Sequence, residues 1–157
     1  MKIKLLVIGK TDDKNLGQLI EKYQQRLNHY VNFEIEIIPD IKNVKNLNQV
    51  QQKEKEGELI LSKLKNTDQL VLLDEKGKEF RSLDFANFLQ KKMNSGIKQI
   101  VLVIGGPYGF SETVYKKAMG KISLSKMTFS HQMIRLFIVE QLYRGFTILK
   151  NEPYHHE

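Results

Sequence analysis

An unbroken apolar run, Ile100-Val101-Leu102-Val103-Ile104, constrains the fold of this chain more than any other feature. A strand without polar positions is typical of a parallel sheet whose two faces are both covered by helices. Other strand patterns occur at 2–8, 33–37, 70–73 and 122–124, and helical patterns separate them. We therefore predict an α/β fold with a mainly parallel sheet and helices on both faces. Since the 157 residues show no linker or internal repeat, we expect residues 1–157 to form a single domain.

Local signals mark the turns and the helix starts of the second half of the chain. The charged residues from Asp74 to Arg81 predict a turn around Gly77. Ser82 is expected to be the N-cap of the next helix. Ser111, followed by an acidic residue, predicts the start of another helix after the central strand.

Three segments follow predicted strands and carry residues suited to binding a ligand. They are Leu73-Asp74, the glycine loop Gly105-Gly106-Pro107-Tyr108-Gly109, and the hydroxyl-rich run from Ser123 to Ser130. Ligands of α/β sheets bind at the carboxyl ends of strands, so we predict that the three segments form one small-molecule pocket. Simpler alternatives are a tight turn for the glycine loop and an N-cap role for Ser130. The glycine loop matches neither a Walker A motif nor the Rossmann pattern.

The apolar residues between Met133 and Leu149 cover nearly every face of the helix that their spacing predicts. A helix that is apolar all round is buried all round. A domain of this size rarely encloses a helix completely, so we predict a subunit interface, most simply that of a two-fold dimer. The alternative is an ordinary helix at the centre of the core.

Composition narrows the classes of partner. The formal charge of +7 and the isoelectric point of about 9.5 favour an anionic partner, most commonly nucleic acid, over a lysine-rich surface that only confers solubility. The chain has no cysteine and no histidine pair at metal-binding spacing, so we predict no metal. No stretch approaches the ~18 apolar residues of a membrane span. The apolar run at 5–8 is too short for a signal peptide, and we expect a cytoplasmic protein.

Histidines are the natural candidates for a general base near neutral pH. His131 precedes the final helix, and His155 and His156 lie in the tail, residues 153–157. A single histidine at a helix start is more often structural, and chain ends are usually frayed. Serine hydrolase and kinase motifs are absent, as are paired carboxylates at obvious spacing. These patterns predict a basic, dimeric α/β domain with a pocket at strand ends, without specifying a reaction.

Five motifs taken together identify a family resemblance that covers the whole chain. They are Leu-Leu-Asp at 72–74, Ile-Gly-Gly-Pro-Tyr-Gly at 104–109, Leu-Ser-Lys-Met-Thr-Phe-Ser-His at 124–131, Glu-Gln-Leu-Tyr-Arg at 140–144 and Asn-Glu-Pro-Tyr-His at 151–155. The chain resembles the ribosomal RNA large subunit methyltransferase H family, minimal members of the SPOUT class. The resemblance implies a SPOUT-type sheet with a C-terminal trefoil knot, a homodimer, and S-adenosylmethionine (S-adenosyl-L-methionine) held in the knot loops. It also implies methylation at N3 of a pseudouridine in helix 69 of 23S rRNA, on assembled ribosomes. Topology rules alone would favour an ordinary open sheet, because knots are very rare.

The resemblance also assigns roles to residues. Cofactor contacts fall on Leu73, Gly105 and the run Leu124, Ser125, Lys126, Met127, Thr128 and Phe129. His155 is the leading candidate to assist at N3, from either subunit, and His131 is the second. Tyr154 would stack on the target base.

Charged side chains complete the expected RNA contacts. Arg135, Arg144 and Lys126 are candidates for phosphate contacts, with a solvated surface role as the alternative for each. The family usually carries Arg or Lys where this chain has His156, so an RNA contact from that position would be weaker. Two other functions stay open: a SPOUT methyltransferase acting on tRNA, and a non-catalytic ribosome-binding protein that uses only its basic surface.

Overall fold

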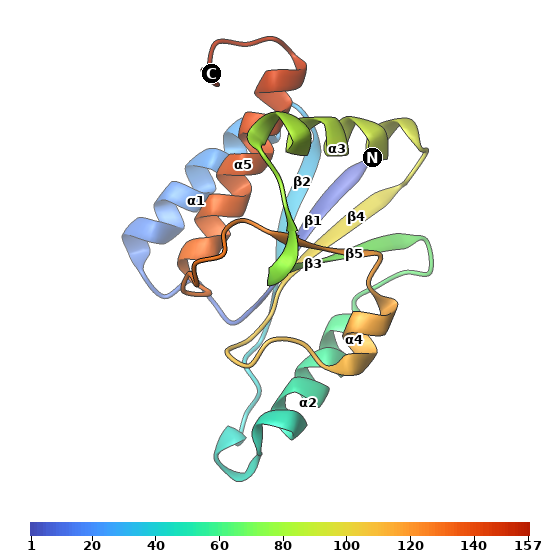
Figure 1. The fold of residues 1–157 in the computed structure, drawn as a ribbon. Helices are drawn as coiled ribbons and strands as arrows, with labels where there is room; N and C mark the ends of the chain where they lie inside the picture. Colours follow the sequence, from blue (N-terminus) through green and yellow to red (C-terminus); the bar gives the residue numbers. More distant parts are fainter.

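The computed structural model describes residues 1–157 and contains one five-stranded sheet with the strand order β2-β1-β4-β3-β5 (Figure 1). All neighbouring strands are parallel. The apolar run at 100–104 lies in β4, the middle strand of the sheet. The pattern at 33–37, in which apolar and polar residues alternate, lies in β2 at one edge. The strands are β1 (Lys2–Ile8), β2 (Asn32–Ile38), β3 (Asp68–Glu79), β4 (Gln99–Ile104) and β5 (Gly120–Ser123).

Helices cover both faces of this sheet, which confirms the predicted architecture. One face carries α1 (Lys14–Leu27), α3 (Ser82–Asn94) and α5 (Met133–Leu149); the other carries α2 (Gln49–Ser62) and α4 (Glu112–Lys117) (Figure 1). A short 3₁₀ helix, Val44–Asn46, precedes α2. Alternate residues of β4 enter the two cores: Leu102 packs with α1, α3 and α5, whereas Val103 packs with α2 and α4. This is why the strand has no polar position.

The structure corrects the expectations for residues 74–82. β3 continues to Glu79 instead of ending in a turn, and its pairing with β5 shifts register between Leu73 and Lys78. A Cβ atom at Gly77 would lie 2.7 Å from the backbone of Ile122, so only glycine permits this close pairing. The N-cap of α3 is Arg81, and Ser82 is the first helical residue. β5 begins earlier than expected, at Gly120.

The final helix has the bounds that its pattern predicts, but a single chain covers most of its apolar surface. α5 lies between α1 and α3 (Figure 1), and Ile138, Val139 and Leu142 are fully buried. The alternative of a central core helix therefore accounts for most of the pattern, and the dimer stays a prediction. No helix of the structure has the length and hydropathy that crossing a membrane requires.

Arg135 ties the start of α5 to the end of β1. Its side chain is 2% exposed and donates hydrogen bonds to the carbonyl oxygens of Ile8 at 2.8 Å, Gly9 at 2.9 Å and His131 at 3.1 Å. The guanidinium therefore faces protein carbonyls, so the expected phosphate contact of Arg135 is wrong: the side chain is buried and its donors are used within the protein. The neighbouring Gln132 also bonds to the loop after β1. The segment between β5 and α5 thus lies against that loop, which is compatible with a knot.

Candidate active site

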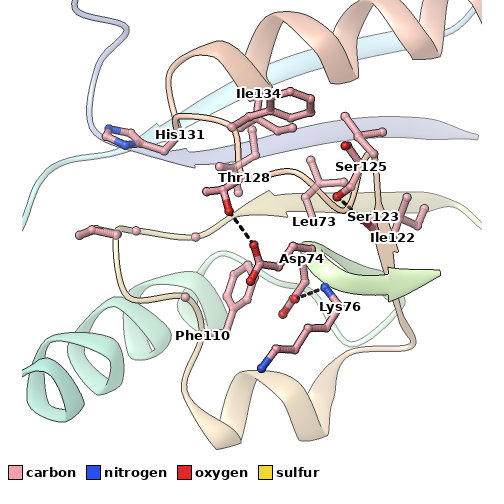
Figure 2. A pocket seen from close by; sticks show the side chains of 18 of the residues that line it. Leu73, Asp74, Lys76, Phe110, Ile122, Ser123, Ser125, Thr128, His131 and Ile134 are labelled. Carbon is pink, nitrogen blue, oxygen red and sulfur yellow. Dashed lines mark hydrogen bonds between the residues drawn. The ribbon is translucent and has the colours of Figure 1, made fainter. Parts of the chain in front are cut away.

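A cavity of about 620 Å³ lies at the carboxyl ends of β4 and β5 and beside residues 73–76 in the middle of β3 (Figure 2). All three predicted segments line it, so the expectation that they converge is confirmed. Its volume is within the range of about 300–1,000 Å³ that is typical of small-molecule sites. Of the residues expected to contact a cofactor, the cavity is lined by Leu73, Gly105, Leu124, Ser125, Met127, Thr128 and Phe129. Lys126 is different: its side chain is 85% exposed, 3.7 Å from Glu79, and does not line the cavity.

The glycine loop is both a tight turn and a wall of the cavity. The Gly109 N–H donates to the Gly106 carbonyl at 3.1 Å, and Gly109 has a φ of +79°, which favours glycine. A Cβ atom at Gly105 would lie 3.1 Å from the Phe110 ring, and one at Gly106 would collide with the Glu56 carboxylate. The loop therefore leaves no room for side chains on the protein side.

Glu56 supports the glycine loop from α2, and sequence reasoning did not find it. The side chain is 3% exposed and its Oε1 atom has no hydrogen-bond partner. Burial is the main cause that raises the pKa of Glu56, and the nearby Asp40 carboxylate adds to the effect. Only the proximity of α2 to the loop reveals this role, because Glu56 lies 50 positions earlier in the chain.

Two carboxylates give the cavity a negative side. The Tyr115 hydroxyl donates to Asp74 at 2.5 Å. The Thr128 hydroxyl donates to Glu75 at 3.0 Å, and Figure 2 shows the bond that Thr128 makes. Burial, with a smaller effect of Asp74, raises the pKa of Tyr115 to about 12. These acidic groups suit a positively charged ligand. Tyr115 and Glu75 were also missed, since neither stands in a recognisable local pattern.

The hydroxyl-rich run mostly satisfies its own backbone. The Ser123 hydroxyl donates to the Ser125 carbonyl at 2.8 Å, and the Ser125 hydroxyl accepts from the Met127 N–H at 3.0 Å. Ser130 accepts from the Met133 N–H at 3.0 Å, so it satisfies a backbone donor at the start of α5, although the N-cap position is occupied by Gln132. His131 lies at one edge of the cavity (Figure 2). The run therefore combines helix capping with lining the cavity.

The tail packs on α5 and does not line this cavity in its own chain. The Tyr154 hydroxyl donates to Glu140 at 2.8 Å, and the ring packs on Tyr143 with the centroids 4.7 Å apart. Burial, with smaller effects of Tyr23 and Glu140, raises the pKa of Tyr154. His131 thus lines the cavity, whereas Tyr154 and His155 lie against α5.

His155 and Arg144 interact at the outer side of α5. His155 Nδ1 lies 3.3 Å from an Arg144 nitrogen, and Arg144 also donates to Glu140 at 2.6 Å. The Nε2 atom of His155 is buried without a hydrogen-bond partner, 3.8 Å from Glu157. His156 is exposed. Within the structure no group of three or more histidine, cysteine or acidic side chains could hold a metal ion.

Comparison with known proteins identifies the family. A family model described as "Predicted SPOUT methyltransferase" matches residues 1–155. The chain belongs to the SPOUT methyltransferase family. Curated relatives of this SPOUT chain include proteins named "Ribosomal RNA large subunit methyltransferase H" from Flavobacterium johnsoniae and Flavobacterium psychrophilum, each 72% identical over the full length of both chains. A protein of the same name from Christiangramia forsetii is 67% identical over 99% of both chains.

A solved structure resembles the fold of this SPOUT chain. It is that of a probable methylase family protein from Haemophilus influenzae Rd KW20, with a TM-score of 0.52 and 10% sequence identity. The match covers 95% of this chain and 66% of that one, so the chain spans about two thirds of the length of that protein. At this identity the likeness shows the fold alone.

Proposed function

We propose that this SPOUT methyltransferase uses S-adenosylmethionine to methylate N3 of a pseudouridine in helix 69 of 23S rRNA, on assembled ribosomes in the cytoplasm. The observation that carries the proposal is the convergence of three family motifs on one cavity, in a chain 72% identical to proteins named as methyltransferases of large-subunit rRNA. The basic charge of +7 supports an RNA substrate. We also propose a homodimer, supported by the exposed apolar side chains of Met127, Phe129 and Met133 near the cavity.

The residues of the cavity fit the proposed methyl donor. Leu73, Gly105 and the backbone from Leu124 to Phe129 would hold it, and Gly105 and Gly106 let the main chain form this wall without side chains that would press on Phe110 or collide with Glu56. The carboxylates of Asp74 and Glu75 would face its positive charges. When bound, the donor supplies a methyl group that passes to the ring nitrogen, while the electrons of the sulfur–carbon bond remain on sulfur and the proton of that nitrogen leaves to a protein base.

The protein has to align the reacting groups and to accept a proton from the ring nitrogen, and different residues would perform these two tasks. Alignment of the reacting groups by the cavity walls can remove ~7–11 kcal/mol of a barrier. A base with a pKa near the working pH can add ~10²–10⁴-fold. We propose His155 as that base, since its Nε2 atom has no protein partner, and His131 as the second candidate. Because the tail does not line the cavity of its own chain, it would act from the second subunit or on a ring held beyond that cavity.

Basic side chains at the surface would hold the RNA backbone. Lys126 is largely exposed, and Arg144 is part-buried against Glu140, while His156 would add a weak contact. A dimer with a charge of +7 on each chain would release counterions on binding, so the affinity for ribosomes should fall steeply as salt is raised.

The test is transfer of radiolabelled methyl groups from S-adenosylmethionine to ribosomes from a strain that lacks this gene. Mass spectrometry of 23S rRNA fragments should then show one added methyl group at N3 of a pseudouridine in helix 69. Purified tRNA serves as the competing substrate. Labelling of tRNA instead of 23S rRNA would support the alternative SPOUT function. Ribosome binding without any heat of donor binding in calorimetry would support a non-catalytic protein.

A further inference from the structure

A second, smaller cavity of about 220 Å³ adjoins the candidate donor cavity, and the proposed function does not yet use it. The two cavities share the wall formed by Ile122, Ser123, Leu124 and Phe129. Its other sides come from α5, from the start of α3 and from Phe80, which follows β3. We call this cavity the aromatic slot and define it by Phe80, Ser82, Phe85, Phe129, Phe137 and Gln141.

The lining of the aromatic slot suits a planar ring with polar edges. Four of its residues are phenylalanines, and the Phe129 and Phe137 rings lie with their centroids 5.0 Å apart. Aromatic side chains stack on unpaired RNA bases. Two polar groups interrupt the apolar lining: the Ser82 hydroxyl and the Gln141 amide oxygen, which lie 3.4 Å apart. Together they offer hydrogen bonds to the carbonyl and N–H groups on the edge of a heterocycle.

The size of the aromatic slot limits its occupant. Its volume of about 220 Å³ is below the range of about 300–1,000 Å³ that drug-sized ligands occupy. A whole S-adenosylmethionine or a dinucleotide would not fit, whereas a single ring would. The slot is also separate from the residues that the family motifs assign to the donor, apart from Leu124 and Phe129 in the shared wall.

Hydrogen bonds connect the aromatic slot to the tail. The Gln141 amide donates to one Glu140 oxygen at 2.8 Å, and the other Glu140 oxygen accepts from Tyr154 at 2.8 Å and from Arg144 at 2.6 Å. Arg144 in turn lies 3.3 Å from His155. The slot thus shares one wall with the donor cavity, and Glu140 and Arg144 link its Gln141 to the proposed base.

We propose that the aromatic slot receives the unstacked pyrimidine ring of RNA that accepts the methyl group. The phenylalanines stack on its faces, and Ser82 and Gln141 bond to its edge. This inference rests on the proposed function and deepens it, because it assigns the acceptor to Phe80, Ser82, Phe137 and Gln141, none of which the family motifs assign to the donor. Extruding a base from RNA costs a few kcal/mol, and stacking in such a slot offsets that cost.

The test fills the aromatic slot and leaves the donor cavity intact. For Ser82→Leu we expect kcat/KM for ribosomes to fall at least about 100-fold, since the added carbons occupy the space of the ring. Donor affinity, measured by calorimetry on the free protein, should stay within about twofold, less than the effect of one lost hydrogen bond. The matched control is Ser95→Leu, the same change at the exposed opposite end of α3, which should keep the normal rate.

A second variant keeps the inference testable if Ser82→Leu fails to fold. Gln141→Ala adds no volume and should lower kcat/KM for ribosomes by about tenfold through the lost hydrogen bonds. Thermal unfolding verifies that both variants fold. A normal kcat/KM in both folded variants would overturn the inference. Weakened donor binding would also overturn the inference, because the slot would then belong to the donor site. A changed oligomeric state in size-exclusion chromatography would overturn it too, because the slot would then be a subunit contact. Failure of the unmodified protein to label 23S rRNA would instead refute the proposed function itself.

Discussion

Replacing Gly106 with alanine should damage the donor site through the buried Glu56 beneath it. The new Cβ atom would collide with the Glu56 carboxylate, which is 3% exposed. The Glu56 carboxylate has little room to retreat, because the whole residue is buried beneath the loop. Overpacking of a well-packed site costs typically about 1–3 kcal/mol. Either the protein loses that much stability, or the glycine loop moves into the cavity to avoid the contact.

Both responses can be measured on the free protein. We expect the melting temperature to fall by roughly 2–12 °C, or the dissociation constant for S-adenosylmethionine to rise at least about tenfold, which corresponds to about 1.4 kcal/mol. Calorimetry and thermal unfolding measure the two effects. The matched control is Gly120→Ala, because a Cβ atom there meets nothing within 4 Å and should change neither quantity.

A double variant decides whether the collision is the cause. Glu56→Ala removes the carboxylate, so adding it to Gly106→Ala should restore part of the lost donor affinity or stability, which appears as a non-additive interaction energy. The reasoning is refuted if Gly106→Ala behaves like the unmodified protein. It is also refuted if the effects of the two substitutions simply add, since the loop would then not depend on Glu56.

Three further predictions concern other parts of the structure. Arg135→Met should lower the free energy of unfolding, measured with urea, by at least about 3 kcal/mol, because it leaves buried carbonyl groups of the loop after β1 without donors. Deletion of residues 154–157 should abolish methyl transfer to ribosomes while calorimetry shows nearly unchanged donor affinity; normal transfer would exclude a role for the tail. Burial, with a smaller effect of the Asp74 bond, raises the pKa of Tyr115 from 10.0 to about 12, so the neutral hydroxyl contributes stability that is complete below pH 10 and is lost as the pH rises through 12. Tyr115→Phe should remove this part of the alkaline stability loss, and an unchanged profile would contradict the assignment.

Local patterns predicted the elements well where the periodicity of the residues matches their surroundings. The run from Ile100 to Ile104 became the middle strand because both of its faces are covered by helices. Ser111 caps α4, accepting weakly from a backbone N–H at 3.4 Å. The same reasoning failed at Asp74–Glu79, where charged residues predicted a turn. There Gly77 lets β3 pair closely with β5, and charges are tolerated because this part of the strand faces solvent.

The spacing of apolar residues therefore determined by itself which segments are strands and which are helices, and thus which loops follow β4 and β5 at the cavity. Only the tertiary structure decided which side chains meet there. Glu56 beneath Gly106, and Phe80 opposite Phe137 in the aromatic slot, are pairs from distant parts of the chain. Periodicity specifies that a face is buried, whereas the partner of that face depends on how the crossover helices and the sheet pack together.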